Sequence, residues 1–234
     1  MTTTPTNGPS AGRRGAGGDV DRADDARTAF AAAAEGFVDL ARHVGPDRWT
    51  LPALGSWDVR GLVGHASRSL SLLRQYLDAV PDDAVIEVGD PVAYYEAALS
   101  AERDATARLQ RDAEIAERGR AAGAALGADP ARAVEEHARA ALAVVDTTPD
   151  DAPIATAAGV MTLAGYLPTR TFELAVHSLD LAAALGLAPP PALRPAVAAS
   201  CLLAGHLAAA REDAGDLLLL MTGRMPARPG LSVL

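Results

Sequence analysis

The stretch Thr169-Arg-Thr-Phe-Glu-Leu-Ala-Val-His-Ser-Leu-Asp-Leu-Ala182 decides the fold, because it is too apolar and too regular to be anything but a buried helix. Side chains three and four residues apart share one helix face, which gives a polar stripe of Arg170, Glu173, His177 and Asp180. An apolar stripe holds Phe172, Val176, Leu179 and Ala183, and Leu174, Leu181 and Leu185 cover much of the remaining surface. Burying an ionised carboxylate without a partner is costly, so the polar stripe is expected to face a metal, an ion pair or a wet cavity.

Glu173 and His177 are candidate metal ligands, because a carboxylate oxygen and an imidazole nitrogen at positions i and i+4 can reach one divalent ion. Two simpler interpretations stay open from this segment alone. One is a Glu–His hydrogen bond, and the other is an ion pair between Arg170 and Glu173 on a partly solvated helix.

A second segment, Trp57-Asp-Val-Arg-Gly-Leu-Val-Gly-His65, opens another helix, which should end before Pro81. Its apolar arc holds Val59, Leu62, Val63, Ala66, Leu70, Leu73 and Leu77. His65 lies just outside this arc, on the side of Ser69, Leu72 and Tyr76, where a side chain would point into a gap between two helices. The alternative is a boundary histidine that only hydrogen-bonds within the fold.

Apolar periodicity predicts further helices over residues 20–44, from 90 toward 119, over about 131–145 and over about 193–220. Asp90-Pro91 and Asp129-Pro130 each offer an N-cap followed by a first-turn proline. Residues 146–164 are rich in Thr, Pro, Asp and Gly and predict a loop, and no segment shows strand-like alternation of any length. Long helices joined by short turns predict an all-α, up-and-down helical bundle with extra helices.

The segments Gly55-Ser-Trp-Asp-Val-Arg-Gly-Leu-Val-Gly-His65 and Leu167-Pro-Thr-Arg-Thr-Phe-Glu-Leu-Ala-Val-His-Ser-Leu-Asp-Leu-Ala182 resemble the metal-binding domain of mycothiol-dependent maleylpyruvate isomerases, within the DinB-like superfamily. The resemblance covers most of residues 20–187. It implies that His65, Glu173 and His177 hold one divalent metal, with zinc the expected ion. It also implies mycothiol as a thiol cosubstrate, whose thiolate attacks a small electrophilic substrate.

Two imidazoles and one carboxylate would leave a coordination position of zinc open, which is typical of a catalytic site. His65 and Arg170 are the predicted catalytic residues. Asp180 could orient the His177 ring by accepting a hydrogen bond from it, or could pair with an arginine instead. Arg170 and Arg60 are candidates for binding carboxylates, although a structural ion pair is favoured for Arg60.

The domain division we expect is a disordered tail over residues 1–19, the metal-binding bundle over 20–187, and a C-terminal helix and tail over 188–234. Members of the resembled family carry a C-terminal α/β domain that contributes a catalytic arginine, and here we expect that domain to be missing or vestigial. Arg224 or Arg228 could substitute for its arginine. An isomerase or S-transferase acting on an electrophile other than maleylpyruvate is therefore the favoured function.

Composition excludes several function classes. The net charge of −9, with no basic stripe, argues against nucleic-acid binding. The sequence contains no uninterrupted apolar run of about 18 residues, so it does not predict a membrane span. The single cysteine, Cys201, cannot form an intramolecular disulfide and is expected to be a small buried hydrophobe. We expect a cytoplasmic protein, and a homodimer is left open.

Two alternatives belong to other function classes. A thiol-independent, metal-dependent hydrolase or lyase would use water at the open position of the metal. A non-catalytic helical regulator or binding module would hold no metal or a structural one.

Overall fold

The computed structural model describes residues 16–100, 105–211, 213–226 and 232–233. In chain order its elements are α1 (Ala16–Arg42), the 3-10 helix η1 (Pro46–Arg48), β1 (Pro52–Leu54), β2 (Trp57–Asp58), α2 (Val59–Ser71), α3 (Leu73–Asp78), α4 (Pro91–Ser100), α5 (Ala105–Ala125), α6 (Pro130–Thr147), β3 (Pro153–Thr156), β4 (Gly159–Thr162), α7 (Leu163–Leu185), the 3-10 helix η2 (Pro191–Leu193), α8 (Arg194–Ala210) and α9 (Ala214–Met221).

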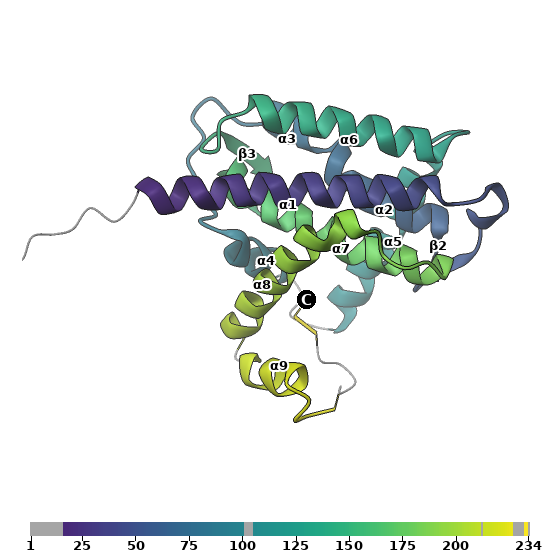
Figure 1. The fold of residues 1–234 in the computed structure, drawn as a ribbon. Helices are drawn as coiled ribbons and strands as arrows, with labels where there is room; N and C mark the ends of the chain where they lie inside the picture. The colour runs from purple at the N-terminus through teal and green to yellow at the C-terminus, as the bar shows by residue number, and fades with distance from the viewer. Residues whose placement is uncertain (1–15, 101–104, 212, 227–231, 234) are drawn as a thin grey trace, which may run out of the picture.

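Four helices form the centre of the molecule (Figure 1). Helices α1 and α2 each pack against both α6 and α7, so the four close a ring around one core. Helix α5 packs along α2, α4 and α8 cover α7, and α9 packs on α8 below the bundle in the view of Figure 1. The predicted all-α helical bundle with extra helices is confirmed.

The core is built from the predicted apolar faces. On α1, Phe30 and Phe37 are fully buried, as are Leu62 and Val63 on α2 and Val134 on α6. On α7, Leu174 and Leu181 are fully buried and Leu185 is nearly so, and all three join the same cluster. The predicted apolar stripe of α7 is wrong in part, because Leu179 is 38% exposed and Ala183 is also exposed.

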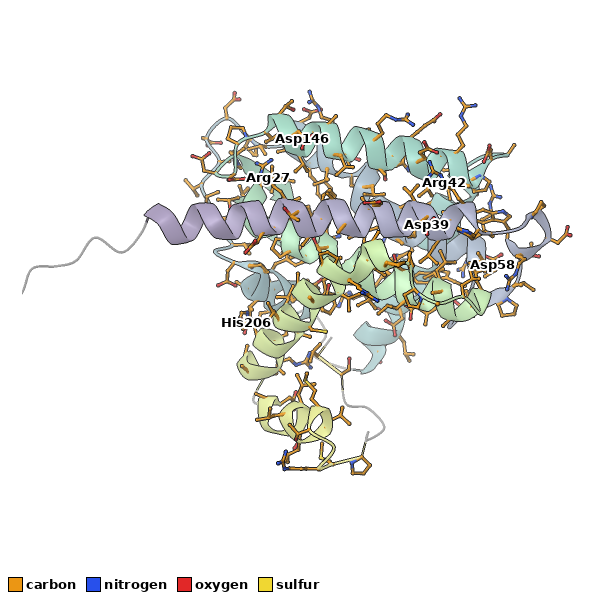
Figure 2. All side chains as sticks on the ribbon, viewed as in Figure 1. Arg27, Asp39, Arg42, Asp58, Asp146 and His206 are labelled. Carbon is orange, nitrogen blue, oxygen red and sulfur yellow. The ribbon has the colours of Figure 1, made fainter. Side chains whose placement is uncertain are left out.

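Aspartates cap the predicted helix starts. The Asp58 carboxylate accepts a hydrogen bond from the Gly61 amide at 2.7 Å and begins α2 at the position labelled in Figure 2. Asp90 accepts from the Ala93 amide at 2.9 Å, and Asp129 accepts from the Arg132 amide at 3.1 Å. Local side-chain chemistry therefore sets where α2, α4 and α6 begin.

Three predicted helices are each divided in two. The second breaks at Leu72 into α2 and α3, and the third is described as α4 and α5, with residues 101–104 outside the described part. The last becomes α8 and α9, because the Asp213 amide donates to the Ala208 carbonyl at 2.8 Å and closes the end of α8.

Two short antiparallel hairpins correct the prediction of no strands, since β1 pairs with β2 and β3 pairs with β4. The second lies inside the predicted loop 146–164, turns at residues 157–158 and re-enters the strand at Gly159, whose φ of 122° favours glycine. Ile154 pairs with Met161, and both are fully buried. Strands of two to four residues are too short for alternation to appear in the sequence.

Other local predictions also change. Residues 16–19 of the predicted tail belong to α1, and residues 1–15 lie outside the described part. Cys201 is exposed on the outer side of α8 instead of buried. The segment Pro191–Ala210 is long and apolar enough to cross a membrane by length and composition alone, a test that core helices of soluble proteins also pass.

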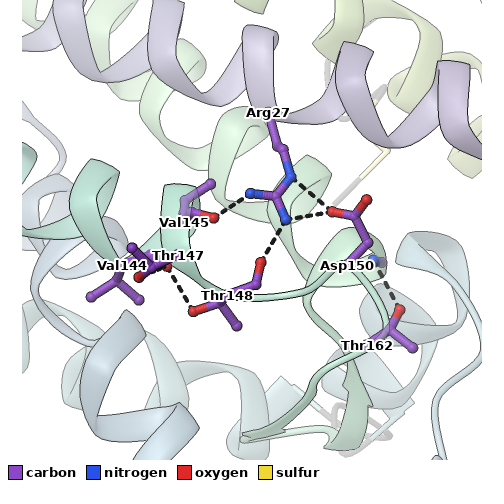
Figure 3. Close-up of polar contacts among 8 residues, drawn as sticks. Arg27, Val144, Val145, Thr147, Thr148, Asp150 and Thr162 are labelled. Carbon is purple, nitrogen blue, oxygen red and sulfur yellow. Dashed lines mark hydrogen bonds and ion pairs between the residues drawn. The ribbon is translucent and has the colours of Figure 1, made fainter.

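Arg27 on α1 anchors the connection that leads from α6 toward α7 (Figure 3). Its Nε donates to Asp150 Oδ1 at 2.7 Å, and its other nitrogens donate to the carbonyls of Val145 and Thr148. Asp150 in turn accepts from the Ala164 amide at 3.0 Å through its backbone carbonyl. The start of α7 is thus tied to α1 through Asp150.

Candidate metal centre

His65 on α2 and the pair Glu173 and His177 on α7 meet where these two helices pack together. One ligand atom from each residue lies within 4.8 Å of the other two. Glu173 Oε2 is 3.9 Å from His65 Nε2 and 3.6 Å from His177 Nε2. The three side chains are 13–22% exposed, so the cluster is largely enclosed and still reachable from solvent.

The spacing of the donors fits a divalent cation. Two ligands bound to zinc at about 2.0–2.1 Å in tetrahedral geometry lie roughly 3.3 Å apart. The two measured distances from Glu173 Oε2, 3.6 and 3.9 Å, exceed this value by a few tenths of an ångström. All three donor atoms lie within 4.8 Å of one another, so they would have to draw closer to bind one ion, and the nitrogen and oxygen set suits zinc.

Each α7 residue of the cluster is oriented by a further contact. His177 Nδ1 lies 3.0 Å from Asp180 Oδ2, so the carboxylate accepts the Nδ1 proton and leaves Nε2 directed at the cluster. The hydroxyl of Tyr95, on α4, donates to Glu173 Oε1 at 3.1 Å. His65 Nδ1 is buried without a hydrogen-bond partner among the described residues.

Trp57 forms one wall of the cluster. Its ring lies over the His65 ring with centroids 4.5 Å apart, and its indole nitrogen donates to the Ala116 carbonyl at 2.9 Å. Gly119 on α5 makes room for the indole, because a Cβ there would lie 2.6 Å from its nitrogen. Trp57 therefore packs as an anchor and also orients His65, which the sequence did not indicate.

The charges of the cluster are strongly coupled. Burial would raise the pKa of Glu173, but the neighbouring rings of His177 and His65, together with the charge of Arg170, hold it well below its usual range. Burial would lower the pKa of His177, but Asp180 and Glu173 raise it to about 9. Burial lowers the pKa of His65 more than Glu173 raises it. In the metal-free protein, Glu173 is ionised and His177 carries the proton at neutral pH.

Arg170 lies beside the cluster in a group of tyrosines. Its guanidinium carbon is 4.7 Å from the centre of the Tyr166 ring and 5.5 Å from that of Tyr94. It donates to the Tyr94 hydroxyl and to Thr169 Oγ1, both at 3.1 Å. No carboxylate of the described residues lies within ion-pair distance of it, so the Arg170–Glu173 ion pair is not formed.

Of the other arginines predicted to bind substrate or to replace the resembled family's catalytic arginine, none that the structure describes lies in the cluster. Arg60 donates to the Gly123 carbonyl at 2.8 Å and also to that of Gly127, which gives it a structural role at the end of α5. Arg224 is exposed after α9, and Arg228 lies outside the described residues. A surface groove between α1, α6 and Pro190 is lined by none of the three cluster residues.

Sequence reasoning missed Tyr95 and the orienting part of Trp57. No spacing relates Tyr95 to Glu173, because the two are 78 residues apart in the chain. The doublet of Tyr94 and Tyr95 after a predicted N-cap carried no chemical signal. Only the packing of α4 on α7 brings the Tyr95 hydroxyl to the carboxylate.

These features define a class of protein, the helical bundle with a candidate metal centre built from inward side chains of facing helices. Residues 30–182 match the family model described as the mycothiol maleylpyruvate isomerase N-terminal domain. This range is more than half of the chain, and the chain belongs to that family. No curated protein and no solved structure matches it.

Proposed function

We propose that this protein is a metal- and thiol-dependent enzyme in which His65, Glu173 and His177 hold one divalent metal, with zinc the expected ion. The thiol is mycothiol, and the reaction is an isomerisation or S-transfer on a small electrophilic substrate. The observation that carries the proposal is the convergence of the three donors, within 4.8 Å of one another, from α2 and α7, although His65 and Glu173 are more than a hundred residues apart in the chain.

The donor set favours catalysis over a purely structural role. Two nitrogens and one oxygen are three of the four ligands that zinc takes, so one position remains for an incoming group. When bound there, a thiol is deprotonated at neutral pH by the charge of the metal. The partial exposure of the three side chains is consistent with access for such a ligand.

Neighbouring residues would support this chemistry. Asp180 would keep His177 in the tautomer that presents Nε2. Arg170 is a cation without a carboxylate partner among the described residues, and we assign it the recognition of an anionic group on the substrate or on the thiol. Its contacts with Tyr94 and Tyr166 hold the guanidinium in place, so this charge is preorganised.

The proposal is tested by turnover assays on the zinc-loaded protein, with and without mycothiol, using a cis-alkene dicarboxylate and an aryl halide as electrophiles. We expect product only when zinc and mycothiol are both present. Turnover with zinc but without any thiol would instead support the hydrolase or lyase. Full turnover after removal of the metal would contradict the proposal.

Zinc binding is expected to release a proton from His177. Its pKa is raised to about 9, so the ring is protonated in the metal-free protein at pH 7 and must lose that proton to bind a metal. The apparent zinc affinity should therefore rise by about tenfold per pH unit below that pKa. Calorimetry in buffers of different ionisation enthalpy measures the proton count.

Asp180→Asn is the matched control for proton release, because it removes one of the carboxylates that raise the pKa of His177. The number of protons released at pH 8 should be smaller in this variant. No proton release in the wild type would show that His177 is not a protonated ligand, and equal release in both proteins would show that Asp180 does not raise the pKa of His177.

A further inference from the structure

The two oxygens of the Glu173 carboxylate have different neighbours. Oε2 faces the Nε2 atoms of His65 and His177, at 3.9 and 3.6 Å. Oε1 instead accepts a hydrogen bond from the Tyr95 hydroxyl at 3.1 Å. One oxygen is therefore available to a cation between the histidines, and the other is engaged by a phenol from a different helix.

Tyr95 is held firmly in this position. Its side chain is 5% exposed and belongs to a second apolar cluster with Phe172 of α7 and with Leu203 and Leu207 of α8. Its ring meets the Phe172 ring edge to face, with centroids 5.7 Å apart. Its hydroxyl also lies 3.3 Å from the Thr169 carbonyl, a second acceptor on α7. Packing on two helices fixes where the phenol can donate.

We propose that Tyr95 is a positioning residue that keeps Glu173 a monodentate ligand of the metal, an inference that rests on the proposed function. A carboxylate that binds through both oxygens occupies two coordination positions, whereas one held through Oε2 alone occupies one. Since zinc takes few ligands, the hydrogen bond to Oε1 preserves the position at which the thiol enters. The contribution of Tyr95 is thus to reactivity at the metal and not to the choice of fold.

The test compares the full-length protein with Tyr95→Phe, after loading both with cobalt(II), whose visible absorption weakens as its coordination number rises. Tyr95→Phe keeps the ring and its packing and removes only the donor. Tyr76→Phe is the matched control, because the Tyr76 ring packs near Tyr166 and its hydroxyl donates to none of the three cluster residues in the described part of the chain. Helical content and thermal unfolding report on the fold of each protein.

We expect weaker cobalt bands in Tyr95→Phe, as Glu173 turns to bind through both oxygens. Zinc affinity should fall by roughly 10-fold or more, as is typical when a hydrogen-bond partner of a metal ligand is removed. Tyr76→Phe should match the wild type in the intensity of the cobalt bands and in zinc affinity. A Tyr95→Phe spectrum identical to that of the wild type would overturn the inference, even if zinc affinity or stability fell. The proposed metal site and function would not be affected by that result. A wild-type protein that binds no cobalt would overturn the inference and the proposed function together.

If Tyr95→Phe fails to fold, Glu173→Gln tests the premise that Glu173 binds the metal through one oxygen. An amide binds a metal through its single carbonyl oxygen, so this variant should keep the band intensity of the wild type if Glu173 is monodentate. Stronger bands in Glu173→Gln than in the wild type would show that the wild-type carboxylate binds through both oxygens, and would also overturn the inference.

Discussion

His65→Ala, Glu173→Ala and His177→Ala are each expected to lose bound zinc, from about one ion per chain to almost none after dialysis. Each variant removes one of three donors that lie within 4.8 Å of one another, and two protein ligands hold zinc far more weakly than three. Metal content of the purified proteins, measured by elemental analysis, is the readout. Unaltered metal content in any two of the variants would refute the assignment.

Helical content should remain nearly unchanged in these variants. The packing of α2 and α7 rests on fully buried apolar residues such as Leu62 and Leu174, not on the polar cluster. His206→Ala is the matched control, because His206 is an exposed histidine on α8, labelled in Figure 2, outside the cluster. It should retain the full zinc content. Loss of zinc in His206→Ala would point to nonspecific binding by histidines.

Gly64→Ala is expected to destabilise the protein by about 3 kcal/mol or more, at the upper end of the cost of overpacking. A Cβ at Gly64 would lie 2.1 Å from the Gly123 nitrogen, 2.4 Å from the Gly123 Cα and 2.7 Å from the Gly119 carbonyl oxygen. All three are backbone atoms of α5, so no side chain can move aside. The two helices would have to separate, and urea unfolding measures the loss in the free energy of unfolding.

Gly205→Ala provides the control for this substitution. Gly205 lies inside α8, and a Cβ there would meet nothing within 4 Å. Alanine favours a helix over glycine by about 0.5–1 kcal/mol, so this variant should be slightly more stable than the wild type.

Because Gly64 precedes His65, Gly64→Ala should also weaken zinc binding. A Gly64→Ala protein as stable as the wild type would show that α2 and α5 do not pack this closely.

Much of the architecture follows from local patterns. The apolar faces of α1, α2 and α6, the aspartate caps of α2, α4 and α6, and the common face of Glu173 and His177 could be predicted, since each depends on neighbours a few residues away along one helix. The hairpins and the divided helices could not, because they are too short to show a period or depend on single turns.

Helical periodicity was sufficient to place Glu173 and His177 on one face and His65 at the edge of another, because one turn of helix links residues three and four apart. The approach of these faces, the Tyr95 hydroxyl on Glu173 and the backbone contact at Gly64 depend on how helices cross. Crossing is set by the whole packed core, in which residues far apart in the chain must fit together at once. No local pattern holds that information.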